Sequence, residues 1–417
     1  MTYARPEARI GQEIITESAD GLDVLVGIVA DPQTGDVLYP LTKAHEGLAL
    51  ACPGQKTAVA LCACSEGGRL REDFLAAPCP APRIYQAAAP GAGSKVQNLF
   101  NLMFLAKRTG ARAVIVLDAD LPSVKRTWIA RLAAPILSGQ ADYTAPFYHS
   151  LNFDTPVTNL YGYPMFRAVF GRRLRQPFYT DRAFSKELND YFLSYEKWPT
   201  ELPYAAAELT MAVLTVGRGA RICQSFLATP RVHWQNSPLG LNAGADFRDI
   251  AGCLLPVVAD FFGLWGQVKR SRPTPVTGTE LTPSIIAPRQ VDPPEVFAEE
   301  IQRIAGLRKD LWREAFDGRK DWLFQKITSE PPDELGVAPE DWAYVCMKSV
   351  AAFRRLGPED KPGFVEALSA VFFARLLGWL KNGAGLSLPQ MEALTEEECR
   401  LFEANRPRLI ADWAALG

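Results

Sequence analysis

The fold is decided by the stretch at residues 111–120, which reads ARAVIVLDAD. All residues from Ala113 to Leu117 are apolar, which is typical of a strand buried on both faces of a parallel sheet. Asp118 and Asp120 follow at once, with one alanine between them. Ligands of open α/β sheets bind at the carboxyl ends of the strands, so this stretch predicts both the fold class and the place of a site.

Other strands and helices are predicted on both sides of this stretch. Residues 23–29 and 57–64 are apolar runs that end in turn-forming residues, and residues 37–50 between them have the pattern of a helix. The order strand, helix, strand is the unit of a parallel sheet. Further predicted elements are strands at 83–86, 143–148 and 220–227, and helices at 95–109, 128–137, 155–170 and 208–216.

The composition and the hydrophobic periodicity of the sequence change after about residue 270. Prolines interrupt the next stretch, and helical periodicity without strand alternation then continues to the end of the chain. We therefore predict an α/β domain at 1–270, a proline-rich linker at 271–294 and an all-helical C-terminal domain at 295–417. The aromatic residues of this tail are typical of a helical core, and they could also support a homodimer.

Composition and charge narrow the class of protein. The net charge is −2 and the pI is about 6.1, so no basic excess favours nucleic acid as a partner. The first residues lack the apolar core of a signal peptide, and no run approaches the roughly 20 apolar residues of a membrane span. We expect a cytoplasmic protein. The eight cysteines are scattered, which predicts buried free thiols rather than a disulfide framework.

The aspartate pair after the buried strand has two interpretations. Two carboxylates separated by one residue offer hard oxygen ligands for Mg²⁺ or Mn²⁺, and such an ion would neutralise a diphosphate leaving group. Alternatively, Asp120 precedes Leu121 and Pro122 and could simply cap a helix. The spacing alone leaves both open, and the place of the pair after a buried strand favours the metal site.

Several segments resemble one family of enzymes. Residues 23–28, 114–121 and 170–177 are similar to the GT-A glycosyltransferases related to glucosyl-3-phosphoglycerate synthase and mannosylglycerate synthase. The similarity continues through 223–227 to His233 and into the tail, so that order and spacing carry it rather than one motif. It implies a GT-A, Rossmann-like nucleotide-sugar-binding domain. It also implies hexose transfer, with retention, from a UDP- or GDP-sugar to a small acidic or polyol acceptor such as glycerate or phosphoglycerate.

The resemblance also implies roles for individual residues. It places the metal ligands at Asp118, Asp120 and His233. It assigns Asp181 to sugar hydroxyls and gives Glu208 a second acidic catalytic position. The donor-binding residues that it implies are Gly27, Asp31, Glu66, Lys95 and Asp118.

Three loops depart from the family pattern. Residues 30–34 lack the aromatic contact for the base, and Gly93-Ser94-Lys95 stands where relatives have Gly-Lys-Gly. Residues 178–181 read FYTD in place of Gly-Gly-Asp. We expect retained donor binding with an altered base preference.

Two other classes of function stay open. A nucleotidyltransferase also presents paired carboxylates on an α/β sheet, but residues 27–35 hold no lysine or arginine for its N-terminal signature. A non-catalytic homologue with a regulatory or scaffold role would explain the altered loops. Arg172, Arg173 and Arg175 could attract an acidic acceptor or could form a solvated face.

Overall fold

The computed structural model describes residues 3–64, 68–79, 81–148, 155–199, 203–231, 241–279, 292–316, 318 and 321–416. Contacts within the chain group it into two units. The first unit comprises Met1–His149, Phe178–Asn236 and Thr274–Ser284, and the second comprises Ser150–Pro177, Ser237–Pro273 and Ile285–Gly417. The domain limits at residues 270 and 294 stay a prediction.

The first unit is built on a nine-stranded sheet with the order β11-β10-β7-β8-β6-β3-β4-β5-β2. Its strands are β2 (Ile10–Ile15), β3 (Val24–Val29), β4 (Thr57–Ala63), β5 (Arg83–Ala88), β6 (Ala113–Asp118), β7 (Tyr143–Phe147), β8 (Arg182–Ser185), β10 (Ile222–Phe226) and β11 (Val276–Thr277). Only β2 and β8 pair antiparallel with their neighbours in this sheet. The predicted α/β class with a mostly parallel sheet is therefore confirmed. A separate two-stranded sheet pairs β1 (Tyr3–Ala4) with β9 (Trp198–Pro199).

The centre of the sheet explains why residues 113–118 form a strand. All six residues of β6 are buried, as are all six of β3 beside it. An apolar β-branched run of this kind can lie in the middle of a parallel sheet because helices cover both faces. The predicted strands at 23–29, 57–64 and 111–117 are thus confirmed within a residue or two at each end.

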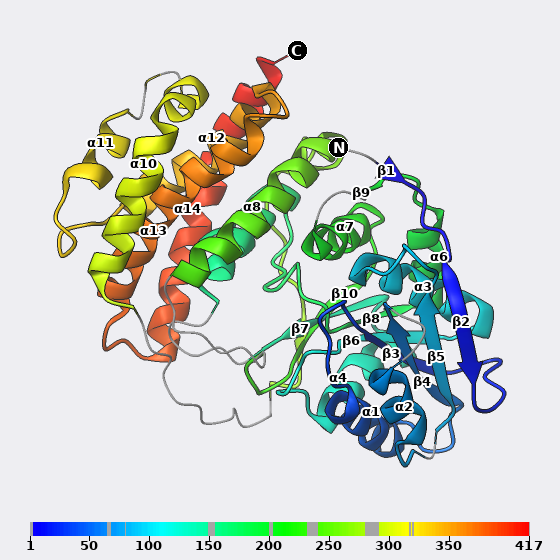
Figure 1. Ribbon diagram of the computed structural model, residues 1–417. Coiled ribbons are helices and arrows are strands. Elements are labelled where there is room, and N and C mark those ends of the chain that lie inside the picture. Colours follow the sequence, from blue (N-terminus) through cyan, green and yellow to red (C-terminus); the bar gives the residue numbers. More distant parts are fainter. Residues whose placement is uncertain are drawn as a thin grey trace. The chain divides into compact units, whose positions relative to one another are not determined.

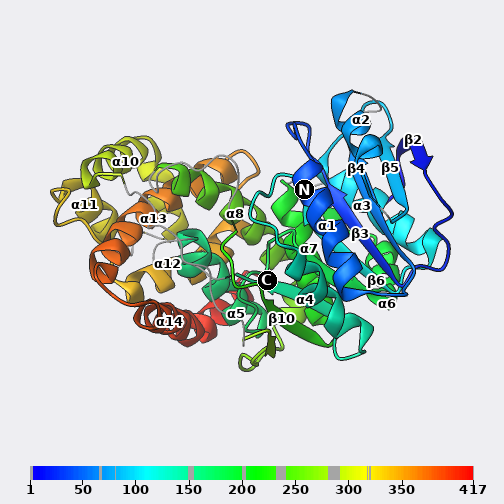
Figure 2. The ribbon, with the colours of Figure 1, turned by 90° about the horizontal axis from the view of Figure 1, so that it is seen from below.

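Helices cover both faces of this sheet (Figures 1 and 2). Helices α1 (Leu38–Ala51) and α4 (Arg126–Leu137) pack together on one face, and α3 (Lys95–Thr109) and α6 (Lys186–Ser194) pack on the other. Helix α7 (Tyr204–Gly217) contacts α3 and α6, and α2 (Arg69–Ala76) contacts β5. At Gly27 an added Cβ would lie 2.1 Å from Leu102 Cδ2, so the approach of β3 to α3 requires a glycine.

Strand β8 was missing from the sequence prediction. It has only four residues and begins with a charged one, so it lacks the apolar run that marks the other central strands. It lies antiparallel between β6 and β7, with Val116 opposite Arg182. An antiparallel strand begins where its parallel neighbours end, so Asp181, just before β8, lies beside Asp118.

The second unit is helical in the part that the structure describes. Its elements are η1 (Thr158–Gly162), α5 (Tyr163–Phe170), α8 (Leu241–Asp260), α9 (Phe262–Trp265), α10 (Pro294–Phe316), α11 (Asp321–Ser329), α12 (Pro339–Arg355), α13 (Lys361–Gly383) and α14 (Leu388–Ala414). Described residues from 292 onward contain helices and no strand, which confirms the predicted helical C-terminal region. Helix α13 is long and apolar enough to cross a membrane by length and composition, yet 83% of its apolar window is buried within the structure.

Side chains from several helices form the core of this unit. The rings of Phe247 and Phe372 stack with centroids 4.5 Å apart, and the indole of Trp342 donates a hydrogen bond of 2.7 Å to the carbonyl of Leu160. All eight cysteines lie in the described part of the chain and are free thiols, as predicted; six of them are buried, whereas Cys64 and Cys79 are partly exposed.

Candidate functional site

The carboxyl edge of the sheet collects charged residues from separate loops. Asp118 is the last residue of β6, and Asp31 follows β3. Lys95 is the first residue of α3, the helix that follows β5. Tyr148 follows β7 and Arg231 comes after β10. Since all these strands run parallel, their following residues meet at one edge, as the sequence argument expected.

Asp118 is held by two cations. Its Oδ2 accepts from Lys95 Nζ at 2.8 Å and from Arg231 Nη2 at 2.7 Å. The Asp118 side chain is only 4% exposed, so these charge-assisted bonds act with little screening by water. The other oxygen, Oδ1, accepts the backbone N–H of Asp120 at 3.2 Å, which closes the turn after β6.

Arg231 also binds a second carboxylate. Its Nε donates to Asp181 Oδ2 at 3.1 Å, and that oxygen accepts the Tyr148 hydroxyl at 2.5 Å. Asp181 Oδ1 accepts the backbone N–H of Asp118 at 3.1 Å. Burial would lower the pKa of Arg231, but the charges of Asp181 and Asp118 outweigh it and raise the pKa well above its ordinary value. Arg231 therefore stays protonated, and its positive charge bridges two buried carboxylates.

Glu208 lies behind these residues on α7. Its Oε1 accepts the Thr180 hydroxyl at 2.6 Å and lies 3.5 Å from Arg182 Nη2. Burial raises the pKa of Glu208 above its ordinary value, although the charge of Arg182 opposes the rise. The Thr180 hydroxyl also lies 3.5 Å from Asp118 Oδ2. Glu208 thus belongs to a buried ion pair that adjoins Asp118, and not to a solvated helix terminus.

Asp118 and Asp120 offer hard oxygen ligands to a divalent cation at this edge, although no group of three or more His, Cys, Asp or Glu side chains that could hold a metal ion occurs among the described residues. Burial raises the pKa of Asp120, and the neighbouring charges of Asp118 and Asp31 raise it further. The described carboxylates of the edge (Asp31, Asp118, Asp120, Asp181 and Glu208) outnumber its described cations (Lys95, Arg182 and Arg231). Excess negative charge on hard oxygen atoms is what Mg²⁺ or Mn²⁺ requires. We call these eight residues, with Tyr148 and Thr180, the carboxylate cluster.

The structure brings together most of the residues that the sequence singled out. Asp118, Asp120, Asp181, Glu208 and Lys95 all lie in the carboxylate cluster, whereas Glu66 and His233 lie outside the described residues. Asp31 Oδ1 accepts the backbone N–H of Gln33 at 2.7 Å and so shapes its own turn. Gly27 lies within β3 against α3, and its donor-binding role stays a prediction.

Other members of the cluster had no role in the sequence prediction. Tyr148, Thr180, Arg182 and Arg231 each bind at least one of the predicted carboxylates. Tyr148 is the last residue of the predicted strand at 143–148, and Arg231 comes shortly after the predicted strand at 220–227; these positions at carboxyl ends were the available signal. Arg182 could not be found this way, because β8 itself was not predicted.

A second charged region lies in the second unit. Basic side chains line a cavity of about 770 Å³, which we call the basic pocket. Its charged lining residues are Arg172, Arg173, Lys269, Arg270, Arg272, Glu403 and Arg406. A parallel bridge between Arg172 and Arg272 brings the segment with Arg172 and Arg173 against the segment with Arg270 and Arg272. Arg175, the third arginine of the predicted group, does not line the pocket, and its Nη2 lies 3.1 Å from Glu392 Oε1.

The positive side chains that line the basic pocket outnumber the negative ones. Glu403 is bound by Arg167, whose Nε lies 2.8 Å from Glu403 Oε1. The Nε atoms of Arg172 and Arg406 are buried and make no hydrogen bond within the described residues. Burial lowers the pKa of Arg172, and the charge of Arg272 lowers it further. Such a surplus of positive charge favours an anion in the pocket.

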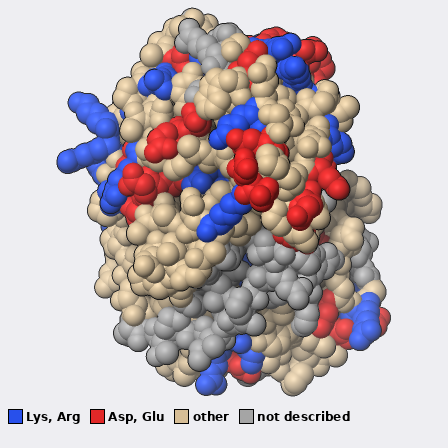
Figure 3. All heavy atoms as spheres, turned by 90° about the vertical axis from the view of Figure 1, so that its left-hand side faces the viewer, with Lys and Arg blue, Asp and Glu red and all other residues tan. Residues whose placement is uncertain are grey.

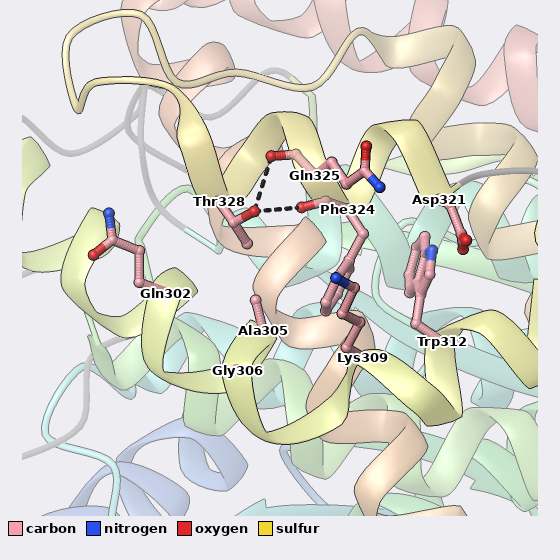
Figure 4. Close-up of a pocket in the computed structure, with 9 residues that line it drawn as sticks. All are labelled: Gln302, Ala305, Gly306, Lys309, Trp312, Asp321, Phe324, Gln325 and Thr328. Carbon is pink, nitrogen blue, oxygen red and sulfur yellow. Dashed lines mark hydrogen bonds between the residues drawn. The ribbon is translucent and has the colours of Figure 1, made fainter.

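Another cavity, of about 410 Å³, lies between α10 and α11 (Figure 4). The rings of Trp312 and Phe324 stack there with centroids 5.0 Å apart. The Thr328 hydroxyl donates to the carbonyls of Phe324 and Gln325, so its hydrogen is directed to its own helix. On the face drawn in Figure 3, acidic and basic side chains are interspersed. This cavity contains none of the residues that the sequence predicted for a site.

No protein-family model matches the chain, and no curated protein matches it. Solved structures do. Glucosyl-3-phosphoglycerate synthase from Mycobacterium tuberculosis, in complex with Mn²⁺ and UDP-glucose, is 18% identical, with 62% of this chain and 88% of that chain covered and a TM-score of 0.40. Mannosyl-3-phosphoglycerate synthase from Rubrobacter xylanophilus is 16% identical, with coverages of 60% and 77% and a TM-score of 0.39.

Proposed function

We propose that the chain is a GT-A hexosyltransferase that takes a hexose from a nucleoside diphosphate sugar. The observation that carries the proposal is the carboxylate cluster, which places Asp118, Asp120 and Asp181 together at the carboxyl edge of a mostly parallel sheet. Ligands bind at this edge in open α/β folds. The same cluster contains two cations, Lys95 and Arg231, in contact with one aspartate, which suits a ligand that carries negative charge.

The N-terminus of α3 is our candidate for the donor's phosphates. Ser94 caps this helix by accepting from the backbone N–H of Gln97 at 3.1 Å, and Lys95 follows as the first helical residue. The free amides and the dipole of a helix N-terminus favour anions. At Gly93 an added Cβ would lie 2.5 Å from the Cys64 carbonyl oxygen, so this loop can lie against the end of β4 only with a glycine.

The metal of the proposed enzyme is Mg²⁺ or Mn²⁺. Asp118 and Asp120 would hold it, with His233 as the third ligand implied by the family resemblance. When bound, it would neutralise charge that develops on the leaving diphosphate. Lys95 would add positive charge beside the same group. Asp181 stays our candidate for holding sugar hydroxyls, and Glu208 supports it through Thr180 and Arg182.

The remaining parts of the proposal concern the acceptor and the setting of the protein. We take the acceptor to be a small acid or polyol, such as glycerate or phosphoglycerate. The surplus positive charge of the basic pocket supports an acidic ligand for this chain. We also propose a cytoplasmic location, and a homodimer through the helical tail stays a prediction.

Calorimetric titration of UDP- and GDP-sugars with Mn²⁺ tests the proposal. Metal-dependent binding of at least one donor is expected, and Asp120→Ala should weaken it at least about tenfold, since a lost metal ligand costs more than 1.4 kcal/mol. Asp142→Ala, at a surface ion pair with Arg221 in the same unit, is the matched control and should bind as the wild type does. If no donor binds, or if Asp120→Ala leaves the binding unchanged, the proposal is wrong. Donor binding without transfer to any acceptor would favour the non-catalytic homologue.

A further inference from the structure

We propose that Arg231 is an internal counter-ion of the donor site, which a divalent cation must displace from Asp118 in order to bind. This inference rests on the proposed function, because it concerns how the metal and donor enter the same site. Arg231 would bridge Asp118 and Asp181 in the ligand-free protein, and its guanidinium would turn to the donor's diphosphate once the metal holds Asp118.

The contacts of Arg231 are those of a substitute cation. One guanidinium reaches two carboxylates, through Nη2 to Asp118 Oδ2 at 2.7 Å and through Nε to Asp181 Oδ2 at 3.1 Å. Its side chain is 9% exposed, and those of Asp118 and Asp181 are 4% and 0% exposed. Two buried carboxylates this close repel each other unless a cation lies between them. Arg231 therefore does for the ligand-free cluster what a metal ion would do.

The bridge uses an oxygen that a metal needs. Lys95 and Arg231 both donate to Oδ2 of Asp118, and Oδ1 is bound to the backbone of Asp120. A cation that coordinates Asp118 through Oδ2 must therefore compete with Lys95 and Arg231. Arg231 is the better candidate for displacement because it comes from the loop after β10, whereas Lys95 is fixed at the first position of α3.

Displacement is favourable only if the released guanidinium finds another anion. A buried guanidinium that leaves two carboxylates needs a new anionic partner, and the ring of Tyr179, whose centroid lies 5.3 Å from the guanidinium carbon, is a contact that Arg231 already makes. A diphosphate supplies that anion, because the planar fork of the guanidinium can donate to two phosphate oxygens at once. The proposal thus predicts that metal and nucleotide bind cooperatively, and that Arg231 is the cause of the cooperativity.

The test is the affinity for Mn²⁺ alone, measured by calorimetry or by the loss of the free-ion electron paramagnetic resonance signal. Wild type should bind Mn²⁺ weakly, and UDP should strengthen this binding. Arg231→Gln should bind Mn²⁺ about tenfold more tightly than wild type, because the metal no longer competes with a charge-assisted hydrogen bond to Asp118. In this variant UDP should improve Mn²⁺ binding less than in wild type.

Two further variants complete the test. Arg231→Lys keeps the charge but cannot bridge both carboxylates in a planar fork. Its Mn²⁺ affinity should therefore lie between those of the wild type and Arg231→Gln. This variant also keeps the test valid if circular dichroism shows that Arg231→Gln is unfolded. Arg221→Gln, at an arginine paired with Asp142 on the surface, should behave as wild type. Equal Mn²⁺ affinity in wild type, Arg231→Gln and Arg231→Lys overturns this inference, as does Mn²⁺ binding to none of them. Failure of the proposed function is a different result, namely that no UDP- or GDP-sugar binds.

Discussion

The carboxylate cluster of the first unit and the basic pocket of the second differ in whether their charged side chains have partners of opposite charge. In the cluster, Asp118, Asp181 and Glu208 each lie within ion-pair distance of a lysine or an arginine. In the pocket, Arg172 lies against Arg272, and burial and this neighbour both lower its pKa. The paired carboxylates of the cluster (Asp118, Asp181 and Glu208) are stabilised before any ligand arrives, whereas adjacent arginines without a balancing carboxylate gain stability from a ligand of opposite charge.

The largest effect should follow from removing a charge in the cluster. Asp118→Asn leaves Lys95 and Arg231 buried with less negative charge beside them. We expect a loss of about 3 kcal/mol in the free energy of unfolding, measured by urea denaturation. Asp142→Asn breaks a surface pair with Arg221 and should cost less than about 1 kcal/mol. Equal losses in the two variants would show that the cluster is not a compensated buried network.

The next effect is the response of the basic pocket to anions. Sulfate should stabilise the wild type, by about 1.4 kcal/mol when its concentration is tenfold above the dissociation constant. Arg172→Gln should reduce this gain, and Arg303→Gln, at an exposed arginine paired with Glu300, should keep it. The measurement is the melting temperature against sulfate concentration at constant ionic strength. The same gain in all three proteins would mean that sulfate acts elsewhere.

Glu208 gives the cluster a pH dependence of definite sign. Its pKa in the folded protein is raised above the ordinary value of 4.5, chiefly by burial. The folded state therefore holds this proton more tightly than the unfolded state, and stability is lost as pH rises from the ordinary pKa through the raised one. Glu208→Gln removes this titration. We expect the free energy of unfolding of the wild type, relative to that of Glu208→Gln, to fall as the pH rises above 4.5. A rise in this difference with pH would contradict the assigned direction of the pKa shift.

The smallest effect should come from removing one charge of the basic pocket. Arg272→Gln relieves the repulsion with Arg172, so that stability should rise by about 0.5 kcal/mol at low salt. The gain should vanish near 1 M salt, where the screening length is about 3 Å. Urea denaturation at the two salt concentrations measures it. A destabilised Arg272→Gln at low salt would show that the pocket is compensated after all.

The sequence predicted the centre of the sheet because the continuous apolar run before Asp118 is typical of a strand that is buried on both faces. It placed Asp118 and Asp120 at the carboxyl edge for the same reason. It did not predict β8, whose four residues depend on β6 and β7 for their conformation. Asp181 was named from the family resemblance alone, and its place beside Asp118 follows from that antiparallel strand.

Side-chain contacts were beyond the reach of sequence patterns. Arg231 has no periodicity or motif that shows which carboxylates it binds, since the contact joins residues more than a hundred positions apart. The family resemblance implied a donor-binding role for Gly27, and the structure places this residue against Leu102 of α3. Pairings of this kind depend on how loops from separate strands converge, which no local window contains.

A crystal structure with Mn²⁺ and a nucleoside diphosphate would test the central claim most directly. The account predicts an anomalous manganese peak at the carboxylates of Asp118 and Asp120, a diphosphate beside Lys95, and an Arg231 that has left Asp118. A diphosphate bound in the basic pocket, with no manganese at Asp118 or Asp120, would contradict it.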